Sequence, residues 1–571
     1  MSDSPYTKLS REEIAEMEVG NTAISRTLSI ALALAFALTI LSVPIVQHFI
    51  EIRAGFQNSR SWVWPRVYEI FQYPRQAWTA LRNPTNENLM SRLKEASSIL
   101  TRGFQSYEVA LENDSFITQM ALPHTQALTA EFLGLGNEQV YLGKKNWLFY
   151  QPDVAYLTGQ GFLDPSFQRS RARNGEENAT KAIQPDPIKA IIQIRDQLRR
   201  RNIQLLIVPI PVKPMIEPEF LSSAYNSSAP IPLQNPSYGV FLSRLEDANI
   251  DYLDVSQTLA SGKQSTGQSQ FLRTDTHWTP EAMERAVTLL TEKIRALGME
   301  ADGQDIELKR SSRTVHGLGD IAAMLKLPAN SQLFEKETVT IYPVSQADGK
   351  PWSADHGAQI LVLGDSFFNI FSLEGMGWGT SAGFVEQLSY SMQRPIDAIL
   401  RNDAGASATR ELLSQELARG RDRLAGKQLV VWEFAVRELS EGNWNFIDLV
   451  TPHSPVGKFL VLQAGERRKV SATIKASGTM PQPGSSPYKD FLTAFHIAGI
   501  EEVPTHEAIV YLQTMQNQQL TPAARLRPGE TVSLQLTSWT DAEPEHGGTN
   551  RSELDDENLL LEQPNFGELL P

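Results

Sequence analysis

The sequence contains no cysteine among its 571 residues. This absence excludes disulfide bonds, catalysis by a cysteine thiolate and zinc sites with cysteine ligands. Histidine is scarce as well, with nine residues, so each candidate for a catalytic imidazole can be considered in turn. A chain of this length is too long for one hydrophobic core, and we expect two or three domains.

Basic side chains are too few to balance the acidic ones. Lys and Arg together number 52 and Asp and Glu 66, which gives a formal net charge of -14. No stretch gathers Lys and Arg into a basic stripe, so a nucleic-acid partner is not expected. The negative charge does not exclude an anionic substrate, because a local pocket can carry the opposite sign.

One long segment lacks charge altogether. Residues 27–50 contain no Asp, Glu, Lys or Arg, which is enough for one helical crossing of about 30 Å of hydrocarbon. A cleavable signal peptide would have a shorter apolar core and a small-residue exit, whereas the exit here is "VPIVQHF". A buried helix of a soluble domain would show a polar face. The segment is therefore predicted to be an uncleaved transmembrane signal anchor.

The flanks of this segment set the expected topology only weakly. Basic residues stand on both sides of it, so the positive-inside count is nearly balanced: Lys8, Arg11 and Arg26 before it, and Arg53, Arg60 and Arg66 after it. We expect the short arm, 1–26, to remain in the cytoplasm. The prediction is a single-pass protein of the bacterial inner membrane with its catalytic domain in the periplasm.

The sequence changes rhythm twice beyond the apolar segment. Residues 51–136 place apolar positions at helical spacing and are predicted to form a helical collar. Residues 137–450 alternate amphipathic helices with short apolar strands, which predicts an α/β domain with a parallel sheet covered on both faces. Residues 451–571 contain strand-like segments with turns rich in Gly and Pro, which predicts an antiparallel β-sandwich with an acidic tail.

Three predicted strands of the α/β region end at residues that can carry chemistry. They are followed by Lys213 after "LLIVPIPV", by Ser366 after "ILVLGD", and by the stretch from Glu433 to Arg437. Sites in parallel sheets form at the carboxyl ends of strands. A serine at such a turn is exposed at the sheet edge, and the backbone N–H groups of Ser366 and Phe367 at a helix start can bind a developing oxyanion.

A serine nucleophile needs a base, and His277 is the best candidate among the nine histidines. Asp275 precedes it by two positions in "TDTHW". In extended backbone these side chains point to one side, so the carboxylate can reach the imidazole Nδ1 and leave Nε2 facing a serine. His316, in "VHGLGD", is a second choice. Thr279 and Pro280 are predicted to cap and begin the next helix.

Other residues near the predicted strand ends allow two interpretations each. Lys213 could contact substrate or be a solvated lysine. Glu433 and Arg437 could orient the site or bind an anionic sugar, although a structural ion pair is favoured. Trp278 could stack on a sugar, although packing is favoured. Asp365 is interpreted as a turn residue, and no metal site is predicted.

Five segments, taken together and in order, resemble the alginate O-acetyltransferase AlgX/AlgJ family, which has an SGNH-hydrolase-like domain. They are "VYLGKKNWLFY", "VPIPVKPMIEPEFL", "TDTHWTPEAM", "LVLGDSFFN" and "LVVWEFAVREL". Asn146 stands where the family usually has glycine. The resemblance covers about 138–445 and implies an SGNH-like α/β/α sandwich with a Ser366–His277–Asp275 triad.

The resemblance further implies an O-acetyltransferase that acetylates an exported polysaccharide through an acyl-serine. A polysaccharide acceptor, a membrane-bound O-acyltransferase that supplies acetyl groups, and an export or synthesis complex are the expected partners, with no cofactor. The β-rich region would then be a carbohydrate-binding domain. An SGNH-type acetyl esterase has the same triad, and a non-catalytic polysaccharide-binding or export scaffold is a second alternative.

Overall fold

A computed structural model describes most of the chain, in ranges separated by short gaps. The described residues are 25–59, 66–82, 89–178, 183–225, 231–299, 306–402, 405–449, 459–484, 488–501, 503–556 and 559–570. Residues 1–24 of the predicted cytoplasmic arm and the predicted domain boundary near 450 lie outside them. Contacts divide the chain into two units, 1–125 and 126–571.

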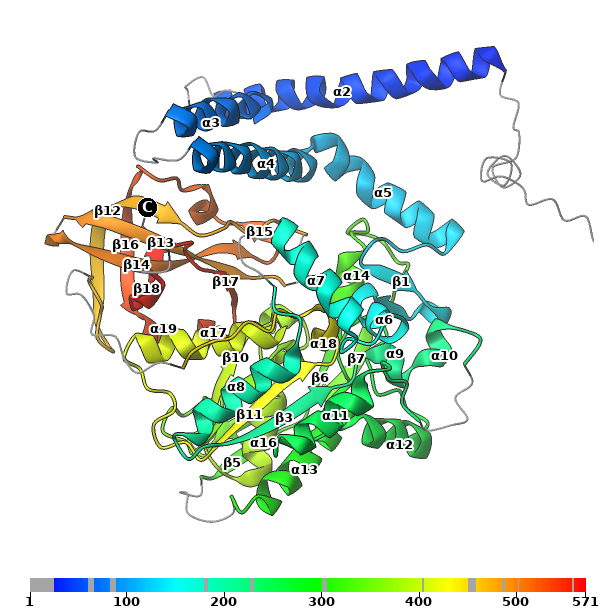
Figure 1. The fold of residues 1–571 in the computed structure, drawn as a ribbon, viewed down its shortest axis with the longest axis vertical. Coiled ribbons are helices and arrows are strands. Elements are labelled where there is room, and N and C mark those ends of the chain that lie inside the picture. The colour runs from blue at the N-terminus through cyan, green and yellow to red at the C-terminus, as the bar shows by residue number, and fades with distance from the viewer. Residues whose placement is uncertain are drawn as a thin grey trace, which may run out of the picture. The chain divides into compact units, whose positions relative to one another are not determined.

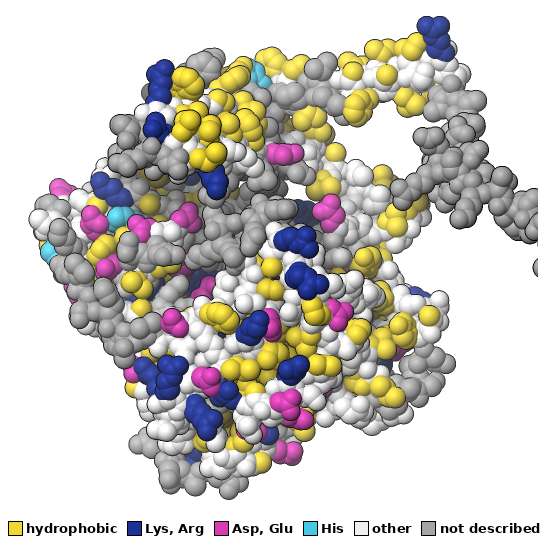
Figure 2. Space-filling model, viewed as in Figure 1, with side chains coloured by type: hydrophobic (Ala, Val, Ile, Leu, Met, Phe, Trp, Pro, Cys, Tyr) yellow, Lys and Arg dark blue, Asp and Glu magenta, His cyan; other side chains and the backbone are white. Residues whose placement is uncertain are grey.

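The first unit is helical. It contains α2 (Arg26–Ser59), η1 (Arg66–Phe71), α3 (Gln72–Arg82), α4 (Leu89–Asp114) and the beginning of α5 (Phe116–Leu133). The helix α3 is amphipathic: Ala77 and Ala80 are buried, while Trp78 is exposed. Hydrophobic side chains gather over this unit in Figure 2, and many along α2 are exposed. Apolar surface of this kind usually marks a contact with another molecule.

The segment predicted as a membrane anchor, 27–50, forms part of α2. Among the residues that the structure describes, no helix has the length and apolar character needed to cross a membrane. The anchor prediction is therefore not supported, and the structure gives a helix alone for this segment.

A five-stranded parallel sheet forms the centre of the second unit (Figure 1). Its order is β10 (Asp397–Leu400), β9 (Ile360–Gly364), β11 (Leu429–Ala435), β3 (Gln204–Ile210) and β4 (Asp251–Tyr252). The three central strands are buried almost throughout, as expected for a sheet covered on both faces. Because all pairs are parallel, the carboxyl ends meet at one edge. The predicted α/β fold is confirmed.

Helices pack around this sheet and share its hydrophobic core. The larger ones are α8 (Pro187–Arg199), α11 (Tyr238–Asp247), α12 (Ser256–Thr266), α13 (Pro280–Ala296), α16 (Phe384–Met392) and α17 (Gly405–Ala418). Further helical elements of this region are η2 (Lys144–Asn146), α6 (Gln151–Thr158), α7 (Pro165–Asn178), α9 (Lys213–Ile216), α10 (Pro218–Leu221), α14 (Asp320–Met324), α15 (Ser366–Asn369), η3 (Glu374–Met376) and α18 (Glu438–Glu441).

Three antiparallel strand pairs accompany the sheet. They are β1 (Val140–Leu142) with β2 (Leu148–Tyr150), β5 (Leu308–Arg310) with β8 (Val344–Gln346), and β6 (Arg313–Gly317) with β7 (Glu337–Ile341). The first is the predicted strand–turn–strand. Asn146 in its turn has a φ of 61°, a left-handed conformation that asparagine tolerates better than most residues. This explains how Asn146 replaces the usual glycine.

The C-terminal region is a barrel and not the predicted sandwich. Five strands pair in the order β14 (Val503–Gln516), β18 (Pro564–Leu569), β16 (Thr531–Ser538), β12 (Arg467–Ser477) and β13 (Phe491–Ile500). A further β13–β14 pairing closes the ring. Closure follows from the length of β14, which pairs with β13 along most of its course and with β18 on its other edge. Closure also leaves fewer unpaired strand edges.

Alternating side chains of these strands fill the barrel. Val470, Ala472 and Ile474 of β12 point inward with Leu534 and Leu536 of β16. Outside the ring lie β15 (Gln519–Leu520), η4 (Pro522–Arg525), α19 (Trp539–His546), β17 (Asn550–Ser552) and η5 (Leu559–Leu561). The stretch predicted as an acidic tail thus includes β18, a strand of the barrel.

Candidate active site

The carboxyl end of β9 presents the candidate nucleophile. The strand ends at Gly364, and Asp365 caps the short helix α15 by accepting the N–H of Phe367 at 2.8 Å. A Cβ at Gly364 would lie 3.0–3.1 Å from the side chains of Phe368, Leu400 and Glu433, so the turn is closely packed. Ser366 is the first residue of α15, and this cap fixes its direction.

His277 lies in a loop closed by a bridge between Phe271 and Trp278. The segment 273–277 consists of bends, so strand alternation does not bring Asp275 to His277. Instead, Asp275 Oδ1 accepts the backbone N–H of His277 at 3.1 Å, which is an Asx turn. The predicted helix start follows, with Thr279 Oγ1 accepting the N–H of Ala282 at 3.2 Å and Pro280 opening α13.

The structure brings Ser366, His277 and Asp275 into one hydrogen-bonded line. His277 Nδ1 lies 2.6 Å from Asp275 Oδ1, and His277 Nε2 lies 2.8 Å from Ser366 Oγ. With Nδ1–H donating to the carboxylate, Nε2 is left to accept the serine hydroxyl. The three residues are buried, with exposed fractions of 1%, 1% and 2% for Asp275, His277 and Ser366.

The pair of Asp275 and His277 is polarised toward its charged form. Burial alone would raise the pKa of Asp275, but the charge of His277 and hydrogen bonds from His277 and Trp378 hold it well below its usual range. Trp378 Nε1 donates to Asp275 Oδ2 at 2.8 Å. Burial would lower the pKa of His277, but the charge of Asp275 and its hydrogen bond raise it above 6.5, with a further contribution from Asp320.

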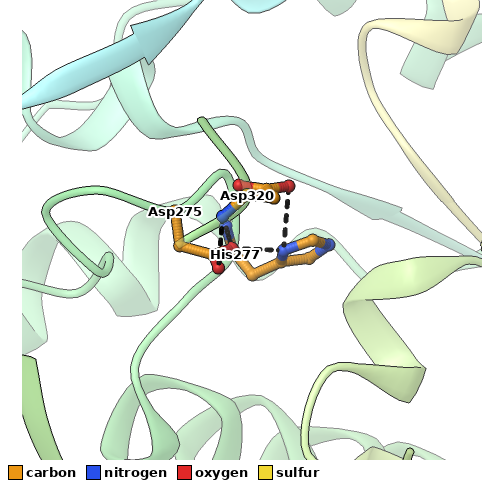
Figure 3. A group of neighbouring side chains, drawn as sticks. All are labelled: Asp275, His277 and Asp320. Atoms are coloured by element: carbon orange, nitrogen blue, oxygen red, sulfur yellow. Dashed lines mark hydrogen bonds and ion pairs between the residues drawn. The ribbon is translucent and has the colours of Figure 1, made fainter. Parts of the chain in front are cut away.

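Asp320, which the sequence analysis did not single out, lies beside this pair. Its Oδ2 is 3.7 Å from His277 Nδ1, and both carboxylates face that nitrogen in Figure 3. Asp320 follows "HGLG" at the start of α14. In the sequence this loop was noted only because it contains His316. His316 is exposed, with its Nδ1 2.7 Å from Thr338 Oγ1. No sequence signal links Asp320 to a histidine 43 positions earlier (320 − 277).

Asp275, His277 and Asp320 could in principle hold a metal ion. Their ligand atoms lie within 4.8 Å of one another. However, both oxygens of Asp275 already accept hydrogen bonds, and both oxygens of Asp320 accept from Thr276. An ion would have to displace the 2.6 Å bond between His277 and Asp275. The arrangement suits proton transfer better than metal binding.

The predicted oxyanion donors differ in what they contact. The N–H of Phe367 donates to Asp365 Oδ1, so the helix cap competes with its predicted role as an oxyanion donor. The N–H of Ser366 stands at the first position of α15, where a helix leaves amide donors without partners inside the helix.

Lys213 is neither solvated nor at the surface. Its side chain is completely buried, and Nζ donates to the carbonyls of Leu148 at 2.7 Å and Arg273 at 3.3 Å. Burial lowers its pKa to about 8, against the opposing charges of Asp275 and Asp320. Both predicted roles, a substrate contact and a solvated lysine, required an accessible cation and are therefore wrong. The lysine ties β2 to the loop that carries the triad.

Glu433 and Arg437 do not form the predicted ion pair. Glu433 Oε2 accepts the N–H of Asp365 at 2.7 Å. Arg437 Nη1 instead lies 3.1 Å from Asp153 Oδ1, and its side chain is 14% exposed. The guanidinium carbon is 5.8 Å from the ring centre of Phe367 and 5.6 Å from that of Tyr150. Arg437 is thus a partly accessible cation next to the nucleophile turn.

Trp278 packs, as favoured from the sequence. Its side chain is completely buried, its Nε1 donates to the carbonyl of Phe367 at 3.1 Å, and its ring stacks on Phe384. It has no exposed face for a sugar.

A cavity of about 890 Å³ is lined by other residues. Its lining includes Trp352, Glu386 and Arg423 of the α/β region, together with Trp539 of α19 and Arg551 of β17 in the C-terminal region. None of Asp275, His277 and Ser366 is among the described residues that line it. The hydrogen-bond geometry, and not the size of a cavity, therefore locates the candidate active site.

Comparison with known proteins places the same region in a family. The model described as "SGNH hydrolase-like domain, acetyltransferase AlgX" matches residues 140–436, which include the triad. The "Probable alginate O-acetylase AlgJ" of Pseudomonas aeruginosa is 25% identical over 307 residues, covering 53% of this chain and 71% of that protein. The protein of the same name from Pseudomonas syringae pv. tomato is 25% identical over 369 residues, covering 63% and 82%.

Among solved structures, the O-acetyltransferase domain of Pseudomonas putida AlgJ is 21% identical, with a TM-score of 0.40, covering 53% of this chain and 93% of that one. The family match spans just over half of the 571 residues. The protein therefore belongs to the AlgX family of acetyltransferases, whose members have an SGNH hydrolase-like domain.

Proposed function

We propose that this protein transfers acetyl groups to hydroxyls of an exported polysaccharide through an acyl-Ser366 intermediate. The observation that carries the proposal is the 2.8 Å contact of His277 Nε2 with Ser366 Oγ, backed by the 2.6 Å contact of Nδ1 with Asp275. This is the geometry of an activated serine. Relatives named for alginate O-acetylation support a polysaccharide acceptor.

In the proposed reaction His277 acts twice. It accepts the Ser366 proton as Oγ attacks the carbonyl carbon of the acetyl donor, and it returns that proton to the departing group of the donor. A sugar hydroxyl then gives its proton to Nε2 while its oxygen attacks the acyl-serine. Collapse of the second tetrahedral intermediate releases Ser366, which is reprotonated. Asp275 orients the ring and stabilises each imidazolium.

The N–H of Ser366 is proposed as an oxyanion donor, because its position at the start of α15 points it away from the helix ladder. Arg437 is proposed as the cation that contacts the substrate, because it is partly exposed beside Phe367. Asp153 holds it there and leaves its other donors for a carboxylate or carbonyl oxygen. An acidic sugar is thus the proposed acceptor class.

The catalytic domain is proposed to work in the periplasm, where an exported polysaccharide passes. Acetyl-CoA does not cross the membrane, so the proposed donor is a membrane-bound O-acyltransferase that delivers acetyl groups to Ser366. The barrel is proposed to bind the polysaccharide within an export or synthesis complex. Reporter fusions after residue 59 and after residue 570 would test this location, and activity of a cytoplasmic reporter at both sites would contradict it.

An acetyl esterase is the main alternative, because water can replace the sugar hydroxyl in the second step. Residues 126–571 would be incubated with a chromogenic acetyl ester, with and without acidic oligosaccharides, and the sugars examined by mass spectrometry. Acetyl on sugar supports transfer, and hydrolysis that no sugar alters supports the esterase. Ser366→Ala should abolish both reactions, whereas Ser533→Ala, at an exposed position on β16, should leave them unchanged.

A polysaccharide-binding scaffold would not need the triad. In cells, Ser366→Ala should therefore remove acetyl groups from the polymer without lowering polymer export. Unchanged acetylation in that strain would favour the scaffold.

A further inference from the structure

We propose that Asp320, acting through Thr276, is a positioning residue for His277. The inference rests on the proposed role of the triad and adds a fourth residue to it. Asp320 Oδ1 accepts the N–H of Thr276 at 2.7 Å, and Oδ2 accepts the Thr276 hydroxyl at 2.6 Å. Thr276 is the residue between Asp275 and His277. The Asp320 carboxylate therefore binds the centre of the loop that carries the catalytic pair.

The Thr276 hydroxyl connects Asp320 to the histidine ring. Its oxygen lies 3.0 Å from His277 Nδ1, and Asp320 Oδ2 lies 3.7 Å from the same nitrogen. Because the hydroxyl donates to Asp320, its lone pairs face Nδ1–H. The ring therefore has a second acceptor beside Asp275, which opposes rotation about its side-chain torsions.

The backbone around Asp320 is built for this contact. Asp320 N–H donates to Asp275 Oδ2 at 3.1 Å, and Gly319 N–H donates to Thr274 Oγ1 at 3.1 Å. A Cβ at Gly319 would lie 2.4 Å from the Thr274 carbonyl and the Asp275 nitrogen. Only glycine lets the two loops approach this closely. The loop 319–320 thus holds both the carboxylate and the histidine of the triad.

The charges around Asp320 give its role an electrostatic part. The titratable groups that interact with it are Asp275 and His277, Lys213 on α9 and Tyr150 on β2. Burial and the charge of Asp275 raise the pKa of Asp320 to about 6, against the charge of His277. Near neutral pH its carboxylate stabilises the imidazolium that forms when His277 takes the serine proton.

The test is Asp320→Asn, which keeps the shape and one acceptor but removes the charge. The plateau kcat for a chromogenic acetyl ester should fall roughly 10- to 100-fold, as expected for loss of a charge-assisted hydrogen bond, with little change in KM. Because the Asp320 charge raises the pKa of His277, the acid limb of kcat/KM should also move to lower pH. A loss of structure alone would lower activity without moving this limb.

Glu337→Gln is the matched control. Glu337 accepts the N–H groups of Arg273 and Thr274 at 2.9 and 3.0 Å, so it grips the same loop away from the histidine ring. It should alter stability but leave the acid limb in place. An acid limb unmoved in Asp320→Asn, or moved equally in Glu337→Gln, would overturn the inference.

Thr276→Val keeps the inference testable if Asp320→Asn does not fold. It removes the hydroxyl bridge and retains the backbone N–H contact with Oδ1, so kcat should fall several-fold, and a wild-type kcat would overturn the inference. Ser366→Ala, measured in parallel, separates the two proposals. If it is inactive while these variants behave as wild type, only the role of Asp320 fails, and if it is active, the proposed function fails.

Discussion

Glu433 and Asp365 hold each other across two neighbouring strand ends. Glu433 Oε2 accepts the backbone N–H of Asp365 at 2.7 Å, and Asp365 Oδ2 accepts the N–H of Ala435 at 3.0 Å. These two bonds tie the end of β9 to the end of β11 directly before Ser366. The position of the nucleophile therefore depends on a buried carboxyl that never contacts it.

Glu433→Gln should hardly change the free energy of unfolding, whereas Glu433→Ala should lower it. Burial and the Asp365 charge raise the pKa of Glu433 well above 4.5, so the folded state favours the uncharged carboxyl that glutamine resembles. Alanine leaves the Asp365 N–H unpaired beside a cavity, which costs about 3 kcal/mol. Urea denaturation at about pH 4, below the unfolded pKa of about 4.3, gives both values. Equal losses for the two variants would mean that the carboxyl is ionised.

The raised pKa of Glu433 also predicts how the stability of the wild type and of Glu433→Gln should depend on pH. A group whose folded pKa is raised contributes stability below its unfolded pKa, and this contribution is lost as pH rises through the folded value. Glu433→Gln lacks this loss. Its free energy of unfolding should therefore improve relative to wild type as pH rises above about 4.3, and parallel pH curves would contradict the assignment.

Asp275→Asn should lower kcat by about 10³- to 10⁴-fold while the fold is retained, because an amide in this place stabilises the wrong tautomer of a catalytic histidine. The distances predict little change in substrate binding, since Asp275 is buried behind His277. Steady-state kinetics and circular dichroism are the measurements. Activity within tenfold of wild type in a folded variant would show that Asp275 does not orient His277.

The pH profile of kcat/KM should have its acid limb above pH 6.5. His277 must be neutral to accept the Ser366 proton, and Asp275 and Asp320 raise its pKa above 6.5, so activity falls as the pH drops through that raised value. A neutral acetyl ester measured between pH 5 and pH 9 isolates this group, because the substrate itself does not titrate. A limb well below 6.5 would show that the base is not this histidine.

Much of the fold and the triad could be predicted from the sequence because both depend on local patterns. Short apolar strands alternating with amphipathic helices predict a parallel sheet, and strand ends in such a sheet meet at one edge. Ser366 and His277 could therefore be paired although they are 89 residues apart. The contact between Asp275 and His277 was predicted correctly, but it was predicted from extended backbone. In the structure an Asx turn joins the two residues.

What could not be predicted depends on contacts between distant segments. Asp320 reaches His277 only because Gly319 lets two loops touch. Lys213 follows a strand end, where solvent is expected, but the hairpin of β1 and β2 covers it through Leu148. Barrel closure depends on which edge of β14 pairs with β18, and the sequence pattern of a strand does not specify which edge pairs with which partner.

Arg437→Met should reduce use of acidic acceptors more than use of the donor ester. The guanidinium is the partly exposed cation next to Phe367, so its loss removes a carboxylate partner while the triad stays intact. The ratio of kcat/KM for an acidic to a neutral oligosaccharide should fall roughly tenfold, the value of one charge-assisted hydrogen bond. Arg437→Lys should restore part of the ratio, and an unchanged ratio in both variants would remove Arg437 from acceptor binding.

Lys213→Met should change how stability depends on pH. Burial lowers the pKa of Lys213 to about 8 from 10.5, so between these values the unfolded chain binds a proton that the folded chain does not. The wild-type free energy of unfolding should then rise with pH over this range, by on the order of 1–3 kcal/mol relative to Lys213→Met. Lys309→Met, at an exposed residue of β5, is the control and should follow the wild type. Chemical denaturation at pH 7.5, 9 and 10 decides, and a Lys213→Met curve parallel to the wild type would show that the buried amine keeps its proton.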